Sequence, residues 1–122
     1  MLAHHRRLVK NEISVLDGRV KGFVRALNCV LDEDEDLALC NLSKLISDPG
    51  RFVQPVDRQI LEELGDEPEL ILEAYSQQGL STANSIHILR TNVTSTEELV
   101  KMKLDTIRNR LLAYNTIISV IR

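Results

Sequence analysis

Apolar residues recur in alternating steps of three and four over the first thirty positions of the chain. The residues that follow this spacing are Val9, Ile13, Leu16, Val20, Phe23, Leu27 and Val30. Such a heptad pattern predicts a helix over residues 3–32 that packs along its length against a partner helix. Gly18 and Gly22 lie four residues apart on one face of this helix, where they would let another helix approach closely.

A shorter helical segment follows, after a turn at residues 32–36. Its apolar positions are Leu37, Leu39, Leu42, Leu45 and Ile46, and they predict a helix over residues 36–47 that returns antiparallel to the first. Asp48-Pro49-Gly50 then signals a turn. Asp57 can cap a short helix over residues 57–64, which Gly65 would end.

The last part of the sequence predicts one very long helix over residues 67–122. Asp66 can cap it, and Pro68 suits its first turn. Apolar or small residues continue the three-and-four spacing at Leu72, Tyr75, Gly79, Thr82, Ile86, Leu89, Val93, Thr96, Val100, Leu104, Ile107, Leu111, Tyr114, Ile118 and Ile121. Two successive steps of four near Val100 form a stutter, which locally unwinds a supercoil.

These elements predict an all-α fold in a single helical domain over residues 1–122. We expect a long antiparallel helical hairpin or a three-helix, coiled-coil-like bundle with a very long C-terminal stalk helix. A helix of that length is not stable alone in water. It therefore needs self-association or the helices of a larger assembly.

Charge is distributed very unevenly along the chain, although the net charge is only -3. Residues 1–30 carry six Lys/Arg and two Asp/Glu, residues 32–73 carry three and thirteen, and residues 74–122 carry six and three. The acidic middle favours a cation or a basic partner, and the basic ends favour anionic surfaces. The chain has no Trp and 3% aromatic residues, which argues against base stacking and hence against nucleic acid as a partner.

Five consecutive carboxylates, Asp32-Glu33-Asp34-Glu35-Asp36, occupy the turn between the first two predicted helices. Like charges at this spacing repel one another by roughly 1 kcal/mol per close pair in water. A bound cation would relieve that repulsion. Asp32, Asp34 and Asp36 are the preferred ligands. The alternative is a solvated helix cap with no metal, in which case no cofactor is bound.

The remaining chemistry of the sequence is sparse. Cys29 and Cys40 are expected as small apolar residues in a reduced core, with a disulfide as the alternative. No Ser/His/Asp or Cys/His arrangement and no glycine-rich phosphate loop can be placed, so we expect neither an enzyme nor a small-molecule substrate. The apolar stretch from Leu111 to Ile121 is shorter than the roughly 20 residues that a membrane-spanning helix needs.

Three stretches of the chain resemble the CorA-type magnesium transporters, specifically their eukaryotic branch from mitochondria and plants. Residues 31–42, LDEDEDLALCNL, are similar to the acidic hairpin of that family. Residues 69–75, ELILEAY, are similar to the start of its long stalk helix. Residues 96–112, TEELVKMKLDTIRNRLL, are similar to the approach of that helix to the membrane, and this string is the most specific of the three.

The resemblance implies a pentameric channel whose stalk helices lead to a pore with a Gly-Met-Asn signature, and whose soluble part senses magnesium through carboxylates. The cation at residues 32–36 would then be weakly bound, regulatory Mg²⁺, which binds through one or two carboxylates while keeping several waters. The present sequence contains no Gly-Met-Asn. We therefore expect either the soluble regulatory and stalk part of such a transporter or a pore-less relative that serves as a structural helical subunit of a larger, mitochondrial complex. The family would place the chain on the matrix side of the inner mitochondrial membrane or at another organelle membrane.

Two further groups of residues acquire a candidate role from this resemblance. Glu97 and Glu98 would contribute to an intersubunit cation site; the alternative is an exposed helix surface, with Glu97 paired to Lys101 four residues later. Lys103, Arg108 and Arg110 would form a juxtamembrane basic collar near the C-terminus, or a docking patch for an acidic partner.

Overall fold

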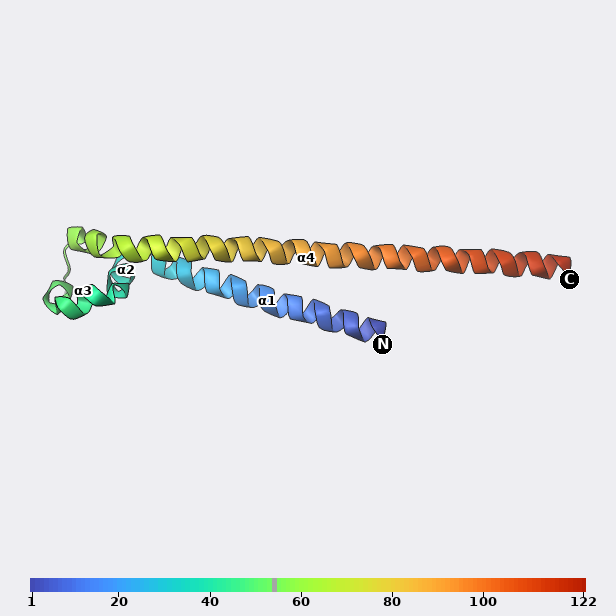
Figure 1. Ribbon diagram of the computed structural model, residues 1–122, viewed down its shortest axis with the longest axis horizontal. Helices are drawn as coiled ribbons and strands as arrows, with labels where there is room; N and C mark the ends of the chain where they lie inside the picture. The colour runs from blue at the N-terminus through green and yellow to red at the C-terminus, as the bar shows by residue number, and fades with distance from the viewer. Residues whose placement is uncertain (54) are drawn as a thin grey trace. The chain divides into compact units, whose positions relative to one another are not determined.

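The computed structural model describes residues 1–53 and 55–122, and every regular element within them is helical (Figure 1). The elements are α1 (Leu2–Leu31), α2 (Asp34–Cys40), α3 (Leu42–Ser47), the 3-10 helix η1 (Pro49–Phe52) and α4 (Arg58–Ile121). The predicted all-α fold with a very long C-terminal helix is confirmed. The chain groups into two units, Met1–Ile86 and His87–Arg122, whereas the sequence predicts one domain.

In the first unit, α1 packs against the first part of α4 (Figure 1). The Ser76 hydroxyl of α4 donates a hydrogen bond to Asn28 Oδ1 of α1 at 3.0 Å. One turn further along α4, Gly79 lies so close to Val24 that an added Cβ would fall 2.6 Å from Val24 Cγ2. Because earlier residues of α1 face later residues of α4, the two helices run antiparallel.

The face of α1 that is buried agrees only in part with the one that the heptad pattern predicts, since Ile13, Val20, Leu27 and Val30 of that pattern are buried or half-buried. Ile13, Asp17 and Val24 are buried, whereas Leu16 and Phe23 are 46% and 50% exposed. Both Val24 and Phe23 lie near Gly79, where an added Cβ would be 2.6 Å from Val24 Cγ2 and 3.6 Å from Phe23 Cδ1, and the closer Val24 is the one that is buried. The apolar period and the positions Ile13, Val20, Leu27 and Val30 were therefore predicted correctly, whereas Asp17 and Val24 are buried in place of Leu16 and Phe23.

The helix predicted over residues 36–47 is divided into α2 and α3 at Asn41. Asn41 has φ −80° and ψ 70°, which is outside the helical region. Its backbone carbonyl accepts hydrogen bonds from the amides of Lys44 and Leu45, so α3 begins afresh after it. The side chain of Asn41 donates a hydrogen bond to the carbonyl of Leu64 in α4 at 3.1 Å. This tertiary hydrogen bond stabilises the non-helical conformation of Asn41 between α2 and α3.

The predicted break between residues 57–64 and 67–122 also needs correction, because α4 runs without interruption from Arg58 through Gly65 and Pro68. Gly65 and Pro68 are both buried, and Leu64 is only 2% exposed. Burial of this turn stabilises the helix at a point where glycine and proline intrinsically disfavour it. Helix α4 begins directly after Asp57, the predicted cap, whose Oδ1 accepts a hydrogen bond from the amide of Gln59 at 3.5 Å.

The second unit consists of residues 87–122, which are helical as far as Ile121. Only Val93 and Glu97 are half-buried in it, and its other side chains are exposed. The exposed side chains include the predicted apolar stripe of Leu104, Ile107, Leu111 and Ile118. Over the described residues, no helix has an apolar stretch long enough to cross a membrane.

Candidate cation site at the acidic tip

The five carboxylates occupy a very short connection between α1 and α2. Asp32 is the C-cap of α1, with its amide donating to the carbonyl of Asn28 at 3.0 Å. Glu33 is extended and precedes α2, whose first turn holds Asp34, Glu35 and Asp36. All five side chains are exposed. We call residues 32–36 the acidic tip.

The two helix ends act in opposite directions on the charges of the acidic tip. Asp34, Glu35 and Asp36 lie in the first turn of α2, where the positive end of the helix dipole favours a carboxylate by about 0.3–1 kcal/mol. Asp32 lies at the negative end of α1, where a carboxylate is disfavoured and a cation is favoured. The end of α1 is thus the part of the acidic tip where a bound cation would relieve the most repulsion.

The acidic tip is not a preformed cage of ligands. Within the part of the chain that the structure describes, no group of three or more His, Cys, Asp or Glu side chains is arranged to hold a metal ion. Exposed carboxylates at the ends of two helices can still hold a hydrated ion through one or two oxygens, as magnesium prefers. Whether Asp32, Glu33, Asp34, Glu35 and Asp36 act as ligands stays a prediction.

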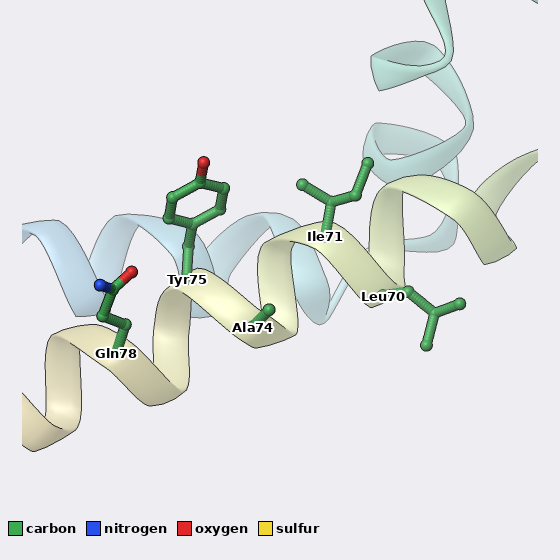
Figure 2. A pocket seen from close by; sticks show the side chains of 5 residues that line it. All are labelled: Leu70, Ile71, Ala74, Tyr75 and Gln78. Carbon is green, nitrogen blue, oxygen red and sulfur yellow. The ribbon is translucent and has the colours of Figure 1, made fainter.

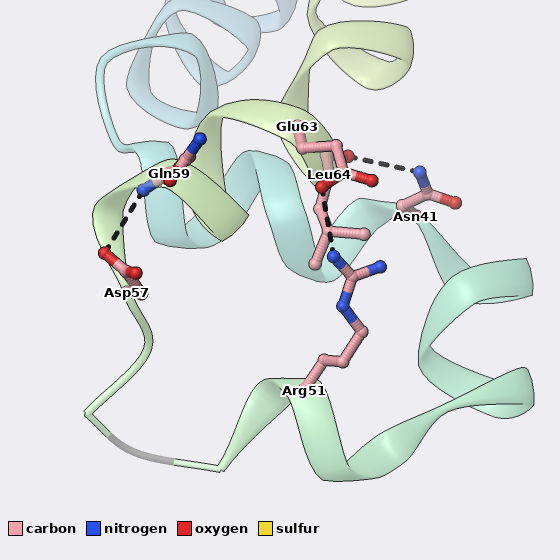
Figure 3. Close-up of polar contacts among 6 residues, drawn as sticks. All are labelled: Asn41, Arg51, Asp57, Gln59, Glu63 and Leu64. Atoms are coloured by element: carbon pink, nitrogen blue, oxygen red, sulfur yellow. Dashed lines mark hydrogen bonds and ion pairs between the residues drawn. The ribbon is translucent and has the colours of Figure 1, made fainter.

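The acidic tip is positioned by the segment that follows it. Leu37 and Ala38 of α2 are 3% and 1% exposed, and an added Cβ at Gly65 of α4 would lie 3.4 Å from Leu37 Cβ. Further on, Arg51 Nη2 of η1 donates to Glu63 Oε2 of α4 at 3.0 Å (Figure 3). This ion pair is largely exposed, so it contributes no more than about 1 kcal/mol. The buried contact of α2 is therefore the main attachment of the acidic tip.

The other predicted cation site lies in the second unit. Glu97 is half-buried in α4, whereas Glu98 and Lys101 are exposed. Both glutamates are in the middle of a helix, away from the ends where the dipole acts. Their role in an intersubunit cation site stays a prediction, as does the pairing of Glu97 with Lys101.

The basic residues near the C-terminus are all exposed on α4. Lys103 and Arg110 are seven residues apart and share one face of the helix, while Arg108 lies on another. The apolar residues Leu104, Ile107 and Leu111 alternate with them and are more than half exposed. Lys103 and Arg110 can thus face an anionic surface together, whereas Arg108 lies on the other side of the apolar residues, which are free to contact a neighbouring helix.

Both cysteines are free and exposed, so the expected place in a reduced core is wrong. Cys29 lies on α1 and Cys40 is the last residue of α2. Cys40 lines a groove of about 320 Å³ together with Leu42, Pro68 and Ile71. A second groove of about 420 Å³ lies beside Ile71, where Leu70, Ala74 and Tyr75 line the surface of α4 (Figure 2).

Sequence reasoning missed the polar contacts that position the acidic tip and the helices behind it. In the sequence, Asn41 resembles any polar residue of an amphipathic helix, and Asn28 and Ser76 resemble surface residues. Ser76 is nevertheless only 5% exposed, and its hydrogen bond to Asn28 joins residues 48 apart in sequence. The one available signal was Pro68, since a proline inside a helix leaves a carbonyl that some other group must satisfy.

Comparison with known proteins identifies a family to which the chain is similar. A family model described as "Magnesium transporter MRS2-like" matches residues 3–108. The matched range includes α1 from residue 3 onward, the acidic tip, the α2–α3 segment, Glu97, Glu98 and Lys103.

A curated protein from Arabidopsis thaliana named "Magnesium transporter MRS2-2" is 28% identical to this chain over 138 aligned residues. The alignment covers 93% of this chain and 35% of the relative. The chain thus spans about a third of the length of that protein. No solved structure matches.

Proposed function

Because this chain belongs to the MRS2-like magnesium transporter family, we propose that it is the helical part of a magnesium transporter and that it senses magnesium through the acidic tip. The family match over residues 3–108 is the observation that carries this proposal. The exposed carboxylates of the acidic tip support it, since they lie where a hydrated cation can reach them. The family is named for transport rather than for a reaction, and an enzymatic role forms no part of the proposal.

The mechanism that we propose is electrostatic. Without a cation, the carboxylates of Asp32, Asp34 and Asp36 repel one another across the connection between α1 and α2. A magnesium ion that keeps most of its water would bridge one or two of them and screen the others. The connection would then be held in one geometry, and α2 with it. The protein would thus sense magnesium through the change from a variable to a fixed geometry of the connection between α1 and α2.

A titration with magnesium tests the proposal directly. We expect the amide resonances of residues 32–36 to shift at millimolar magnesium, and the shifts to be lost in the double variant Asp34→Asn/Asp36→Asn. The double variant Glu69→Gln/Glu73→Gln removes the same charge from exposed positions of α4 and should keep the shifts. If tip resonances stay in place in the unaltered protein, or move equally in both variants, the acidic tip is not the sensor.

We further propose that the chain works in association with other helices, its own copies included. Its accessible surface is 9988 Å² for a mass of 13.8 kDa, whereas a folded monomer of this mass exposes roughly 6600 Å². The excess of roughly 3400 Å² per copy is larger than the roughly 1000–2500 Å² that each partner buries in one obligate interface. Glu97 and Glu98 would lie between copies, and Lys103, Arg108 and Arg110 would lie next to an organelle membrane, on the mitochondrial matrix side if the transporter is mitochondrial.

A second candidate function follows from the same exposed surface. The apolar stripe of the second unit would equally suit a structural helical subunit that packs inside a larger complex without conducting ions. The two functions differ in their response to magnesium. Association that changes with magnesium supports a transporter module, and association that ignores it supports the structural subunit.

A further inference from the structure

Pro68 leaves one backbone carbonyl of α4 without its usual partner. In an α-helix the amide of residue 68 would donate to the carbonyl of residue 64, but proline has no N–H, and its ring also pushes that carbonyl aside. The carbonyl belongs to Leu64, which is 2% exposed. Water therefore has little access to it, and a buried carbonyl without a partner destabilises the fold.

Asn41 provides the missing hydrogen bond. Its side-chain Nδ2 donates to the carbonyl oxygen of Leu64 at 3.1 Å, across 23 residues of sequence (Figure 3). Asn41 is half-buried at the junction of α2 and α3. Its side chain does not cap α3 and is directed at α4 instead.

Apolar packing surrounds this hydrogen bond. Leu37 of α2 lies against Gly65, the residue directly after Leu64, where an added Cβ would be in van der Waals contact at 3.4 Å. Pro68 itself is buried and lines the groove that Asn41 and Leu42 also line. The segment Asp34–Ser47, which we call the strap, is thus seated on the turn of α4 where proline removes a helical hydrogen bond.

We propose that the strap is a latch on a proline hinge in α4. While Asn41 is bonded to the carbonyl of Leu64, α4 continues as one helix through Pro68. When the strap lifts, that carbonyl loses its partner, and α4 opens or bends between Leu64 and Pro68. The acidic tip leads directly into the strap, so an event that moves the acidic tip also acts on the hinge. The latch itself does not depend on metal binding there.

A double-mutant cycle tests the latch, because Pro68→Ala restores the amide that the carbonyl of Leu64 lacks. In the protein with Pro68, we expect Asn41→Leu to accelerate hydrogen exchange of the amides between residues 64 and 72 by about tenfold, because the buried carbonyl of Leu64 loses its hydrogen-bond donor. In the Pro68→Ala background the carbonyl has a helical partner again. The same Asn41→Leu change should then alter exchange by less than about twofold.

Ser76→Ala serves as the matched control. It removes a partly buried hydrogen bond between α1 and α4 that does not involve the proline, so its effect on exchange should be equal in both backgrounds. Asn41→Asp, which keeps the shape but loses the donor, replaces Asn41→Leu if that variant does not fold. The latch is overturned if the change at Asn41 has the same effect in the Pro68→Ala background as in the unaltered protein, or no effect in the unaltered protein.

Discussion

At the scale of single residues, small side chains decide how closely α1 and α4 approach. Gly79 has no room for a Cβ, because Val24 Cγ2 would lie 2.6 Å from it. Gly18 and Gly22 of α1 are different. Nothing within the described residues lies within 4 Å of a Cβ added at either one. The sequence alone marks all three as glycines in helices, and only the contacts separate them.

These glycines give a prediction with built-in controls. Gly79→Ala should lower the free energy of unfolding by about 1–3 kcal/mol, because the added methyl group overpacks the contact with Val24. Gly18→Ala and Gly22→Ala should raise it by about 0.5–1 kcal/mol each, because alanine favours a helix and meets no neighbour. Urea unfolding of the three variants measures both signs. Stabilisation by all three would show that the close contact at Gly79 is relieved at little cost.

At the scale of elements, the strap is held by few but well-buried residues. Leu64 is the largest fully buried side chain of the described residues, and it lies where α2, Asn41 and α4 meet. The predicted separate helices of residues 57–64 and 67–122 are joined because this contact satisfies the turn containing Gly65 and Pro68. Local sequence signals for a helix end were present there, and tertiary packing overrode them.

Substitution of two leucines of α4 tests the weight of this contact. Leu64→Ala should destabilise the first unit by about 2–5 kcal/mol, since it leaves a cavity in a closed site. Leu70→Ala is the control: Leu70 is on the same helix and 70% exposed, so its loss should change stability by less than about 0.5 kcal/mol. Thermal unfolding followed by circular dichroism compares them. If Leu64→Ala and Leu70→Ala lower the stability equally, the packing of the strap around Leu64 does not contribute to the stability of the first unit.

At the scale of the whole molecule, many large apolar side chains of the described residues are exposed, because a single copy has no further helix to cover them. Nearly all of the side chains between His87 and Arg122 are exposed, and an isolated helix gains most of its stability from packing of an apolar face. We therefore expect residues 87–122 to exchange their amide hydrogens faster than residues 64–86 when the protein is dilute, and to become protected as its concentration rises.

Analytical ultracentrifugation over the same concentrations supplies the matching measurement. We expect species heavier than 13.8 kDa, and Leu104→Glu/Leu111→Glu should return the protein to single copies by placing charges in the apolar stripe. Met102→Glu/Ala113→Glu, off that stripe, is the control pair. Exchange that stays fast at every concentration, with a single-copy mass throughout, would contradict association through the second unit.

Much of the architecture follows from the sequence. The three-and-four spacing of apolar residues predicted α1 and the long C-terminal helix, because that period matches the turn of an α-helix. The string of carboxylates marked the acidic tip, and three short stretches identified the transporter family. These features are local, so a single sequence is enough to recognise them.

Tertiary structure decided which side of each helix is buried and which polar residues form hydrogen bonds between helices. On α1, Val24 is buried while its neighbour Phe23 is half exposed, although both lie near Gly79 of α4. Asn41 gains its role from a carbonyl 23 residues away. Burial and hydrogen bonding between distant residues depend on the whole packing arrangement, and periodicity along the chain does not contain that information.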